Sequence, residues 1–211
     1  MKIALFGVGN YTEVLIELCI DCGYSEIELF HFNTEKVGDV LNNCKVLGTY
    51  DDFIGNKDYN TPVAVAIGDN KIRGECLDNL KSLGFTTPPL IHPQAFVSPT
   101  AMIGKACYIH AKSFIWTKTI LGNNCIVSPN AMLAHHVNVG KNCLISANSM
   151  IGSYNRLGDN VLIGINACSI SSPNIEIGNH STVGANSLVT KSVKNHTVVI
   201  GSPAKTLVKN A

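Results

Sequence analysis

The chain has 211 residues, which is enough for one large domain or two small ones with a well-packed core. Its 16 basic and 15 acidic residues nearly balance, so charge gives no reason to expect nucleic acid or an anionic membrane as a partner. The N-terminal segment MKIALFGVGNYTEV has too short an apolar run for a signal peptide, and no stretch is long enough to span a bilayer. We therefore expect a soluble, cytoplasmic protein.

The first part of the chain has the pattern of a small parallel α/β unit. Residues 2–7, K-I-A-L-F-G, predict a short buried strand, followed by the turn G-V-G-N-Y and a helix to about Gly23. Residues 27–33 and 63–70 predict two further strands, and residues 71–84 predict a helix that ends at a glycine. Strand, glycine turn, helix and strand in this order are typical of a Rossmann-like half unit.

A six-residue repeat begins beyond the stiff segment TTPPL at residues 86–90. An aliphatic side chain recurs at every sixth position, and the frame shifts by two at S-S-P-N. The repeated residues are Val97, Ile103, Ile109, Ile115, Leu121, Val127, Leu133, Val139, Ile145, Ile151, Leu157 and Ile163, then Ile177, Val183 and Val189. This period is typical of a parallel β-helix, in which three hexapeptides form one triangular coil. We expect an α/β domain over residues 1–88 and a β-helix over residues 89–211.

Small residues fill the other positions of the repeat. A glycine often follows the aliphatic residue, and we expect it to supply the positive φ of a tight corner. Cys107, Cys125 and Cys143 are 18 residues apart, so they should stack on one edge, one per coil, as structural residues. Cys19 and Cys22 form a C-x-x-C in a helix pattern, but no second ligand pair completes a zinc site. We expect plain thiols there and no disulfides.

Two adjacent histidines, His135 and His136, interrupt the repeat. In the predicted register Leu133 points into the coil and His135 points outward near a corner, where a solenoid can carry functional side chains. His135 could be a general base, a metal ligand or an ordinary surface residue. A metal site would need a third ligand. His110 and His180 are outward candidates on other coils, but no ligand spacing links them.

Six motifs follow one another along the chain. They are G-V-G-N-Y-T-E-V at 7–14, V-A-I-G-D-N-K-I-R at 65–73, L-I-H-P-Q-A at 90–95, A-H-H-V-N-V-G at 134–140, L-I-G-I-N-A at 162–167 and V-I-G-S-P-A-K at 199–205. Together they resemble the sugar O-/N-acyltransferase family of left-handed β-helix proteins, which includes sialic acid O-acetyltransferases and bacillosamine-pathway acetyltransferases. The resemblance implies a left-handed β-helix and a cytoplasmic homotrimer, with each active site between neighbouring β-helices. Acetyl-CoA would lie in that groove, the N-terminal unit would hold a nucleotide-linked sugar, and no metal would take part.

By this resemblance His135 and His136 are the catalytic residues, with His135 as the general base. His136 stands where the family has an acidic residue, in a pattern like H-[DE]-x-x-I-G. An imidazole cannot supply a negative charge there, and a protonated one would weaken its neighbour as a base. An amine nucleophile depends less on a base than a hydroxyl does, so the change favours an amino-sugar acceptor. Backbone N–H groups of the glycine-rich corners near Gly152 and Gly164 could supply the oxyanion donor, and the choice between them stays open.

The same resemblance assigns binding residues to both domains. Those for the substrate are Gly9, Asn10, Tyr11, His31, Phe32 and Gly68. His31 and Phe32 replace an acidic pair that meets the nucleotide in the family, so UDP and dTDP both stay open. Those for acetyl-CoA are Leu144, Ser153, Ile165 and Ala185 along the groove, with Lys205 near the CoA phosphates. Alternatively, Leu144 and Ile165 pack between subunits and Lys205 is a solvated charge.

The predicted function is an acetyl-CoA-dependent N-acetyltransferase acting on a nucleotide-linked amino sugar, for surface glycan such as lipopolysaccharide or O-antigen. Three alternatives stay open. They are a sialic-acid-type sugar O-acetyltransferase, a non-catalytic sugar-nucleotide-binding trimer, and a zinc enzyme similar to γ-type carbonic anhydrases. A dinucleotide oxidoreductase is not indicated, because Glu13 replaces the third glycine of the G-x-G motif and the second strand lacks the ribose-binding acid.

Overall fold

The computed structural model describes residues 1–56, 58–173 and 175–207. The chain divides into two compact units, Met1–Leu90 and Ile91–Ala211. The division lies at the end of the proline-containing segment 86–90, near the boundary proposed after residue 88.

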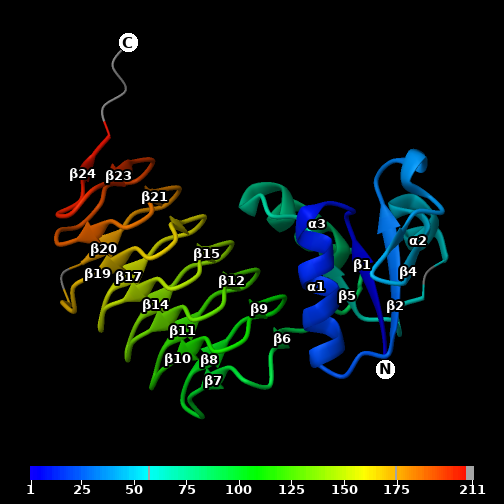
Figure 1. The fold of residues 1–211 in the computed structure, drawn as a ribbon, viewed down its shortest axis with the longest axis horizontal. Coiled ribbons are helices and arrows are strands. Elements are labelled where there is room, and N and C mark those ends of the chain that lie inside the picture. Colours follow the sequence, from blue (N-terminus) through cyan, green and yellow to red (C-terminus); the bar gives the residue numbers. More distant parts are fainter. Residues whose placement is uncertain (57, 174, 208–211) are drawn as a thin grey trace. The chain divides into compact units, whose positions relative to one another are not determined.

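The N-terminal unit is a five-stranded sheet with helices, drawn in blue and cyan in Figure 1. Its strands are β1 (Lys2–Phe6), β2 (Glu26–His31), β3 (Val40–Leu41), β4 (Cys44–Thr49) and β5 (Val63–Val65). Its helices are α1 (Asn10–Asp21), α2 (Tyr50–Asn56) and α3 (Asn70–Ser82), with a 3-10 turn at Thr34–Lys36. The predicted α/β unit is confirmed, and α3 ends before Gly84, whose φ is +93°. The sequence analysis missed β3, β4 and α2.

The order of the strands places a crevice at one edge of this sheet. Strand order is β3-β4-β2-β1-β5, and β1 pairs in parallel with both β2 and β5. The chain therefore places β2 on one side of β1 and, later in the sequence, β5 on the other side. In open parallel sheets, ligands bind at the carboxyl ends of the strands at such a switch point.

The second unit is a parallel β-helix with three faces (Figure 1). Face 1 contains β6 (Leu90–Ile91), β9 (Tyr108–Ile109), β12 (Ile126–Val127), β15 (Leu144–Ile145), β18 (Leu162–Ile163), β21 (Thr182–Val183), β23 (Val198–Ile200) and β24 (Lys205–Thr206). Face 2 contains β7 (Phe96–Val97), β10 (Phe114–Ile115), β13 (Met132–Leu133), β16 (Met150–Ile151), β19 (Cys168–Ser169) and β22 (Leu188–Val189). Face 3 contains β8 (Met102–Ile103), β11 (Ile120–Leu121), β14 (Asn138–Val139), β17 (Arg156–Leu157) and β20 (Glu176–Ile177).

The repeated aliphatic residues fill the interior of the β-helix as predicted. Ile115, Leu133 and Ile151 pair from coil to coil on face 2 and are at most 1% exposed. After the frame shift Leu157 pairs with Ile177 on face 3, so the two extra residues lie in the connection between the coils. The hydrophobic core is therefore one continuous stack of aliphatic layers.

The glycines of the repeat do not supply positive φ, so that part of the sequence interpretation is wrong. The left-handed residue is the third after each aliphatic residue, and it is most often asparagine, as at Asn124 and Asn142, with φ of 62° and 57°. Asparagine tolerates this conformation better than most residues do. The glycines are required by space instead. A Cβ on Gly122 would lie 2.6 Å from the carbonyl oxygen of Gly140 in the next coil.

The cysteine column is confirmed as structural. Cys107, Cys125 and Cys143 are fully buried on successive coils. Each thiol lies 3.1–3.2 Å from a backbone carbonyl oxygen of the next coil, to which it donates. Burial raises the pKa of the Cys125 thiol well above its usual value. A buried, neutral thiol is a weak nucleophile, which fits a packing role.

His110 is buried, whereas the sequence analysis placed it outward. Its side chain is 6% exposed, and burial, with a contribution from His92, lowers its pKa to about 4. Between about pH 6.5 and pH 4, His110 is protonated in the unfolded chain but neutral in the folded chain, so the free energy of unfolding falls as the pH falls through that window.

Between pH 7 and pH 4.5 we expect the free energy of unfolding to fall by about 2 kcal/mol more in wild type than in His110→Gln. Denaturant unfolding followed by Trp116 fluorescence measures this; equal losses would contradict it.

Candidate active site

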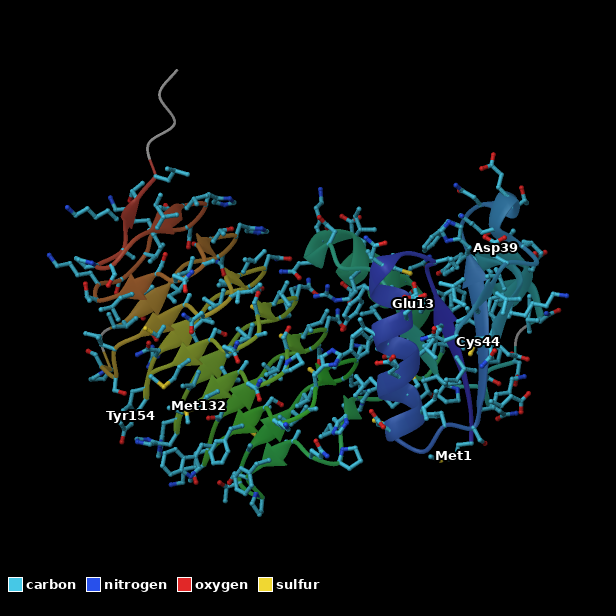
Figure 2. The ribbon with its side chains drawn as sticks, in the orientation of Figure 1. Met1, Glu13, Asp39, Cys44, Met132 and Tyr154 are labelled. Carbon is cyan, nitrogen blue, oxygen red and sulfur yellow. The ribbon has the colours of Figure 1, made fainter. Side chains whose placement is uncertain are left out.

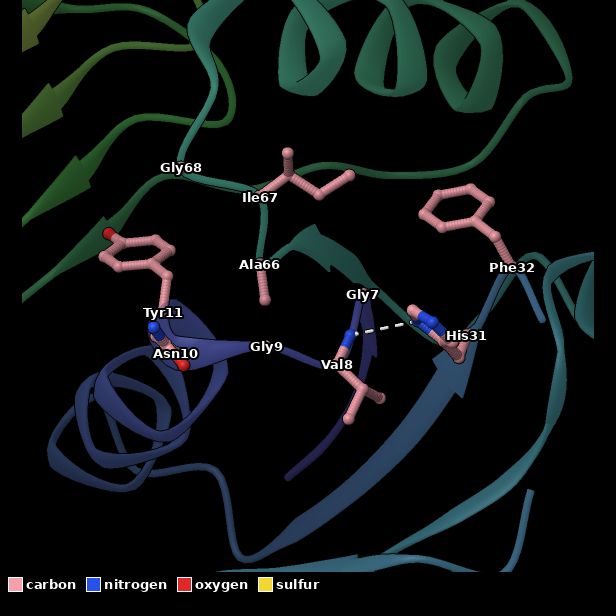
Figure 3. Close-up of a pocket in the computed structure, with 10 residues that line it drawn as sticks. All are labelled: Gly7, Val8, Gly9, Asn10, Tyr11, His31, Phe32, Ala66, Ile67 and Gly68. Atoms are coloured by element: carbon pink, nitrogen blue, oxygen red, sulfur yellow. Dashed lines mark hydrogen bonds between the residues drawn. The ribbon is translucent and has the colours of Figure 1, made fainter. Parts of the chain in front are cut away.

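The predicted substrate residues of the N-terminal unit line one cavity. This cavity has a volume of about 590 Å³ and lies at the carboxyl ends of β1, β2 and β5, beside the start of α1 (Figure 3). All six predicted residues contribute to it, together with Gly7, Val8, Ala66 and Ile67. The structure thus brings together residues at the ends of three strands, at the switch point of the sheet.

The glycines of this cavity have different roles. Gly7 has a φ of +98° and lies against Ala66, so the turn itself requires it. Gly9 and Gly68 do not have a positive φ in the left-handed region, and a Cβ on either would meet nothing within 4 Å. The protein therefore does not require glycine at these two positions, and their missing side chains leave room in the cavity for a ligand.

Some backbone amides of the loop between β1 and α1 already donate hydrogen bonds within the protein. The Gly9 amide donates to Oγ1 of Thr12 at 2.9 Å, and that hydroxyl donates to the carbonyl of Gly7 at 3.0 Å. The Val8 amide donates to Nδ1 of His31 at 3.2 Å (Figure 3). A phosphate at the start of α1 would therefore depend on amides further into the first turn, such as that of Asn10.

His31 and Phe32 present a neutral donor and an aromatic face. Burial and the nearby Lys36 lower the pKa of His31, and its Nδ1 accepts from Val8, so its proton is on Nε2. Phe32 is 46% exposed and stacks on Tyr50 with ring centroids 5.4 Å apart. This arrangement can stack on a nucleobase and donate one hydrogen bond. It cannot accept one as a carboxylate would.

His135 and His136 lie at the corner that follows β13 on face 2. Leu133 is buried, His135 is partly exposed and His136 is exposed with a φ of 60°. The two Nδ1 atoms are 3.1 Å apart. One ring must donate and the other accept, because two unprotonated or two protonated nitrogens cannot form a hydrogen bond.

Aromatic rings from adjacent coils surround this pair. Trp116 from the preceding coil and Tyr154 from the following coil contact the His135 ring edge-on, with centroids 5.6 Å and 5.2 Å away. Tyr154 also stacks on His136 at 5.0 Å and 25°, and it projects from the edge of the β-helix in Figure 2. Beside His136 and Tyr154 is a cavity of about 300 Å³ that Lys118 also lines.

The predicted acetyl-CoA residues do not meet in one chain. Ser153 follows β16 at the same corner type as His135, one coil later. Ile165 and Ala185 are exposed and follow β18 and β21 at a different corner. Leu144 is a partly buried residue of β15 on face 1, and Lys205 is exposed in β24. A single β-helix therefore carries these residues on two separate edges.

The amides suggested as oxyanion donors are engaged within the β-helix. Gly152 donates to the Ser169 hydroxyl at 3.0 Å, and Gly164 donates to the carbonyl of Val183 at 2.7 Å. The Ser153 amide donates to the Ser171 hydroxyl at 3.0 Å. The amides of Gly152, Ser153 and Gly164 are therefore used to bond one coil to the next. An oxyanion donor at these corners remains a prediction for the other amides near them.

Trp116, Lys118 and Tyr154 were missed by the sequence analysis. The spacing of the repeat could have identified Lys118 and Tyr154, since they are 18 residues before and after His136, which is one coil in each direction.

In residues 1–56, 58–173 and 175–207, no three His, Cys, Asp or Glu side chains gather to form a metal site. Among the same residues, no helix has the length and apolar character of a membrane span.

Comparisons with known proteins match both units. Residues 2–80 match the PglD N-terminal domain, residues 118–153 match the bacterial transferase hexapeptide (six repeats), and residues 154–191 match the hexapeptide repeat of succinyl-transferase. The fold and these matches define a hexapeptide-repeat transferase with a PglD-type N-terminal domain. No curated protein sequence matches the chain.

Several solved structures are similar over nearly the full length. The acetyltransferase domain of PglB from Neisseria gonorrhoeae FA1090, in complex with acetyl coenzyme A, is 31% identical with a TM-score of 0.91, covering 98% of each chain. PerB from Caulobacter crescentus, in complex with CoA and GDP-perosamine, is 24% identical with a TM-score of 0.90 over 99% of this chain and 98% of its own. WeeI from Acinetobacter baumannii AYE is 20% identical with a TM-score of 0.88 over 98% and 100%. The chain belongs to the family of left-handed β-helix sugar acetyltransferases that includes the PglB domain.

Proposed function

We propose that this protein is an acetyl-CoA-dependent N-acetyltransferase whose acceptor is a nucleotide-linked amino sugar. The observation that carries the proposal is the full-length similarity to the PglB acetyltransferase domain, which was solved with acetyl coenzyme A. The cavity at the switch point of the N-terminal sheet supports a nucleotide ligand. The outward His135 on the β-helix supports a proton-transfer step.

The chemistry requires one base and a positioned amine. The sugar amine attacks the thioester carbonyl and forms a C–N bond, and His135 takes the proton that the nitrogen loses. Collapse of the tetrahedral intermediate breaks the C–S bond, and the CoA sulfur leaves with a proton returned from the imidazole. A histidine suits both transfers because it titrates near neutral pH.

We further propose that the enzyme works as a homotrimer in the cytoplasm. The two edges that carry His135 with Ser153, and Ile165 with Ala185, would meet between neighbouring subunits. An apolar stripe on face 2 supports such packing, because a monomer rarely exposes a patch of this kind. The outward residues of this stripe include Phe96, Phe114, Met132 (labelled in Figure 2) and Met150. Sedimentation equilibrium should give three times the chain mass; a monomer would contradict this assembly.

The activity is tested by following thiol release from acetyl-CoA with a panel of UDP-, dTDP- and GDP-linked amino sugars, beside free sialic acid. We expect turnover with one nucleotide-linked amino sugar and none with its hydroxyl analogue. Turnover with sialic acid alone would make the protein an O-acetyltransferase. No turnover with any acceptor, from folded protein, would contradict the proposed activity and favour a binding role.

Gly68 gives a test of the nucleotide cavity that does not depend on catalysis. A Cβ at this position meets no protein atom within 4 Å, so Gly68→Val should fold normally and still place its side chain in the cavity. We expect calorimetric binding of the nucleoside diphosphate to weaken about tenfold or more, since a ligand would lose that space. Gly55→Ala, equally unobstructed in α2 but outside the cavity, is the matched control. Unchanged affinity in Gly68→Val would place the nucleotide elsewhere.

A further inference from the structure

Two aromatic side chains occupy successive left-handed corners beside His135. The corner residues Lys118, His136 and Tyr154 lie in one column, one per coil, with φ of 54°, 60° and 64°. Asparagine is favoured in this backbone conformation, and the β-helix has it at many equivalent corners, including Asn124 and Asn160. Histidine is also enriched in this conformation, and His180 and His196 adopt it elsewhere. A tyrosine ring is less common there, which is a reason to ask what the side chain of Tyr154 does.

The ring of Tyr154 is partly buried within the chain and contacts both histidines. The residue is 46% exposed. It stacks on His136 at 25° and 5.0 Å, and it meets His135 edge-on at 88° and 5.2 Å. The ring therefore lies where it limits the orientation of both imidazoles.

We propose that His136 and Tyr154 are positioning residues for His135, and the inference rests on the acetyltransferase function proposed above. If the base acts through Nε2, that nitrogen needs its lone pair, so the proton of neutral His135 must be on Nδ1. The Nδ1–H of His135 then donates a hydrogen bond to Nδ1 of His136, 3.1 Å away. Stacking on Tyr154 keeps His136 in the plane that makes this bond. A neutral imidazole thus replaces the carboxylate that the family pattern has next to the base.

The charged groups around His136 bear on any measured pH dependence. Lys118 and Arg156 line the same cavity as His136, and Glu176 lies 3.8 Å from Arg156. A proton on Nδ1 of His136 would reverse the bond, because His136 would then donate and His135 would carry its proton on Nε2.

Variants of Tyr154 separate stacking from other effects of the ring. Tyr154→Phe keeps the ring, and we expect kcat within about twofold of wild type. Tyr154→Asn keeps the backbone preference of the corner and removes the ring, and we expect kcat to fall about tenfold with both KM values unchanged. Lys112→Asn makes the same kind of corner change at a φ of 58°, away from the histidines, and serves as the control. It should leave kcat unchanged.

A double-mutant cycle tests whether Tyr154 acts through His136. An aspartate at position 136 would tolerate the positive φ, and its carboxylate would accept a hydrogen bond from the Nδ1–H of His135 without a stacked ring. We expect His136→Asp to keep or exceed the wild-type kcat, with the acid limb of its pH profile displaced from that of wild type. Tyr154→Asn in this background should then change kcat by less than about twofold. An equal tenfold fall in both backgrounds, or no fall in wild type, would overturn the proposal.

The ¹⁵N signals of the imidazoles give a readout that needs no turnover. In the resting full-length protein we expect His135 to carry its proton on Nδ1, and Tyr154→Asn to yield a mixture of tautomers. A proton on Nε2 of His135 in wild type would overturn the inference while leaving the acetyltransferase function standing. If no acceptor is acetylated, the function fails, and the tautomers still decide whether the pair is built as proposed.

Discussion

Replacing His135 by glutamine is expected to lower kcat for acetyl transfer about 100-fold or more. Glutamine keeps a polar side chain of similar reach, but it cannot take the proton that the attacking amine loses. His135 is partly exposed at a corner of the β-helix and is not part of its buried aliphatic core, so we expect the variant to fold. Initial rates at saturating acetyl-CoA and nucleotide sugar measure the effect.

The control for this prediction is binding. Both KM values and the thermal midpoint of His135→Gln should stay close to those of wild type, since the change removes proton transfer and leaves the pockets intact. A variant that keeps most of its kcat would show that His135 is not the base. A variant that loses acetyl-CoA binding would show that His135 holds the cofactor instead.

Substituting Gly122 by alanine is expected to have the largest effect on stability, a loss of about 2–3 kcal/mol in the free energy of unfolding. The added Cβ would lie 2.6 Å from the carbonyl oxygen of Gly140 and 2.9 Å from the amide of Lys141. Both are backbone atoms of the next coil, so neither can rotate away. Denaturant unfolding followed by Trp116 fluorescence reports on the β-helix that contains the substitution.

Gly184→Ala is the matched control for Gly122→Ala. It is in the same position of the repeat, but the nearest atom to its Cβ is Cγ2 of Ile200, a side-chain atom of a residue that is 44% exposed. That side chain can change rotamer, so we expect a loss of about 1 kcal/mol or less. Equal losses for the two variants would show that glycine matters here for backbone freedom and not for the close approach of the coils.

The β-helix could be predicted from the sequence because its period is global. Each aliphatic position from Val97 to Val189 repeats one environment, so errors in a single residue do not shift the register. The role of the glycines could not be predicted, since φ and a close coil contact both favour glycine. The asparagines at the corners, such as Asn124, were the better signal for positive φ. Strand β3 was missed because it has only two residues, and β4 was missed because only Val46 and Gly48 of its six residues are buried.

The candidate site was predicted in its parts but not in its arrangement. Family motifs indicated Gly9, His31 and Gly68, and the fold of the sheet brings them to one cavity. The pairing of Nδ1 atoms in His135 and His136, and the stacking of Tyr154, depend on side-chain directions at two corners. Those directions follow from the positive φ of His136 and Tyr154, which the hexapeptide pattern alone did not reveal.

The most direct test of the central claim is the mass of the product formed from acetyl-CoA and a nucleotide-linked amino sugar by wild-type enzyme, with fragmentation to locate the acetyl group. We predict a gain of one acetyl group on the sugar nitrogen, with one CoA thiol released for each product. An acetyl group on a hydroxyl, or CoA release without an acetylated nucleotide sugar, would contradict this account.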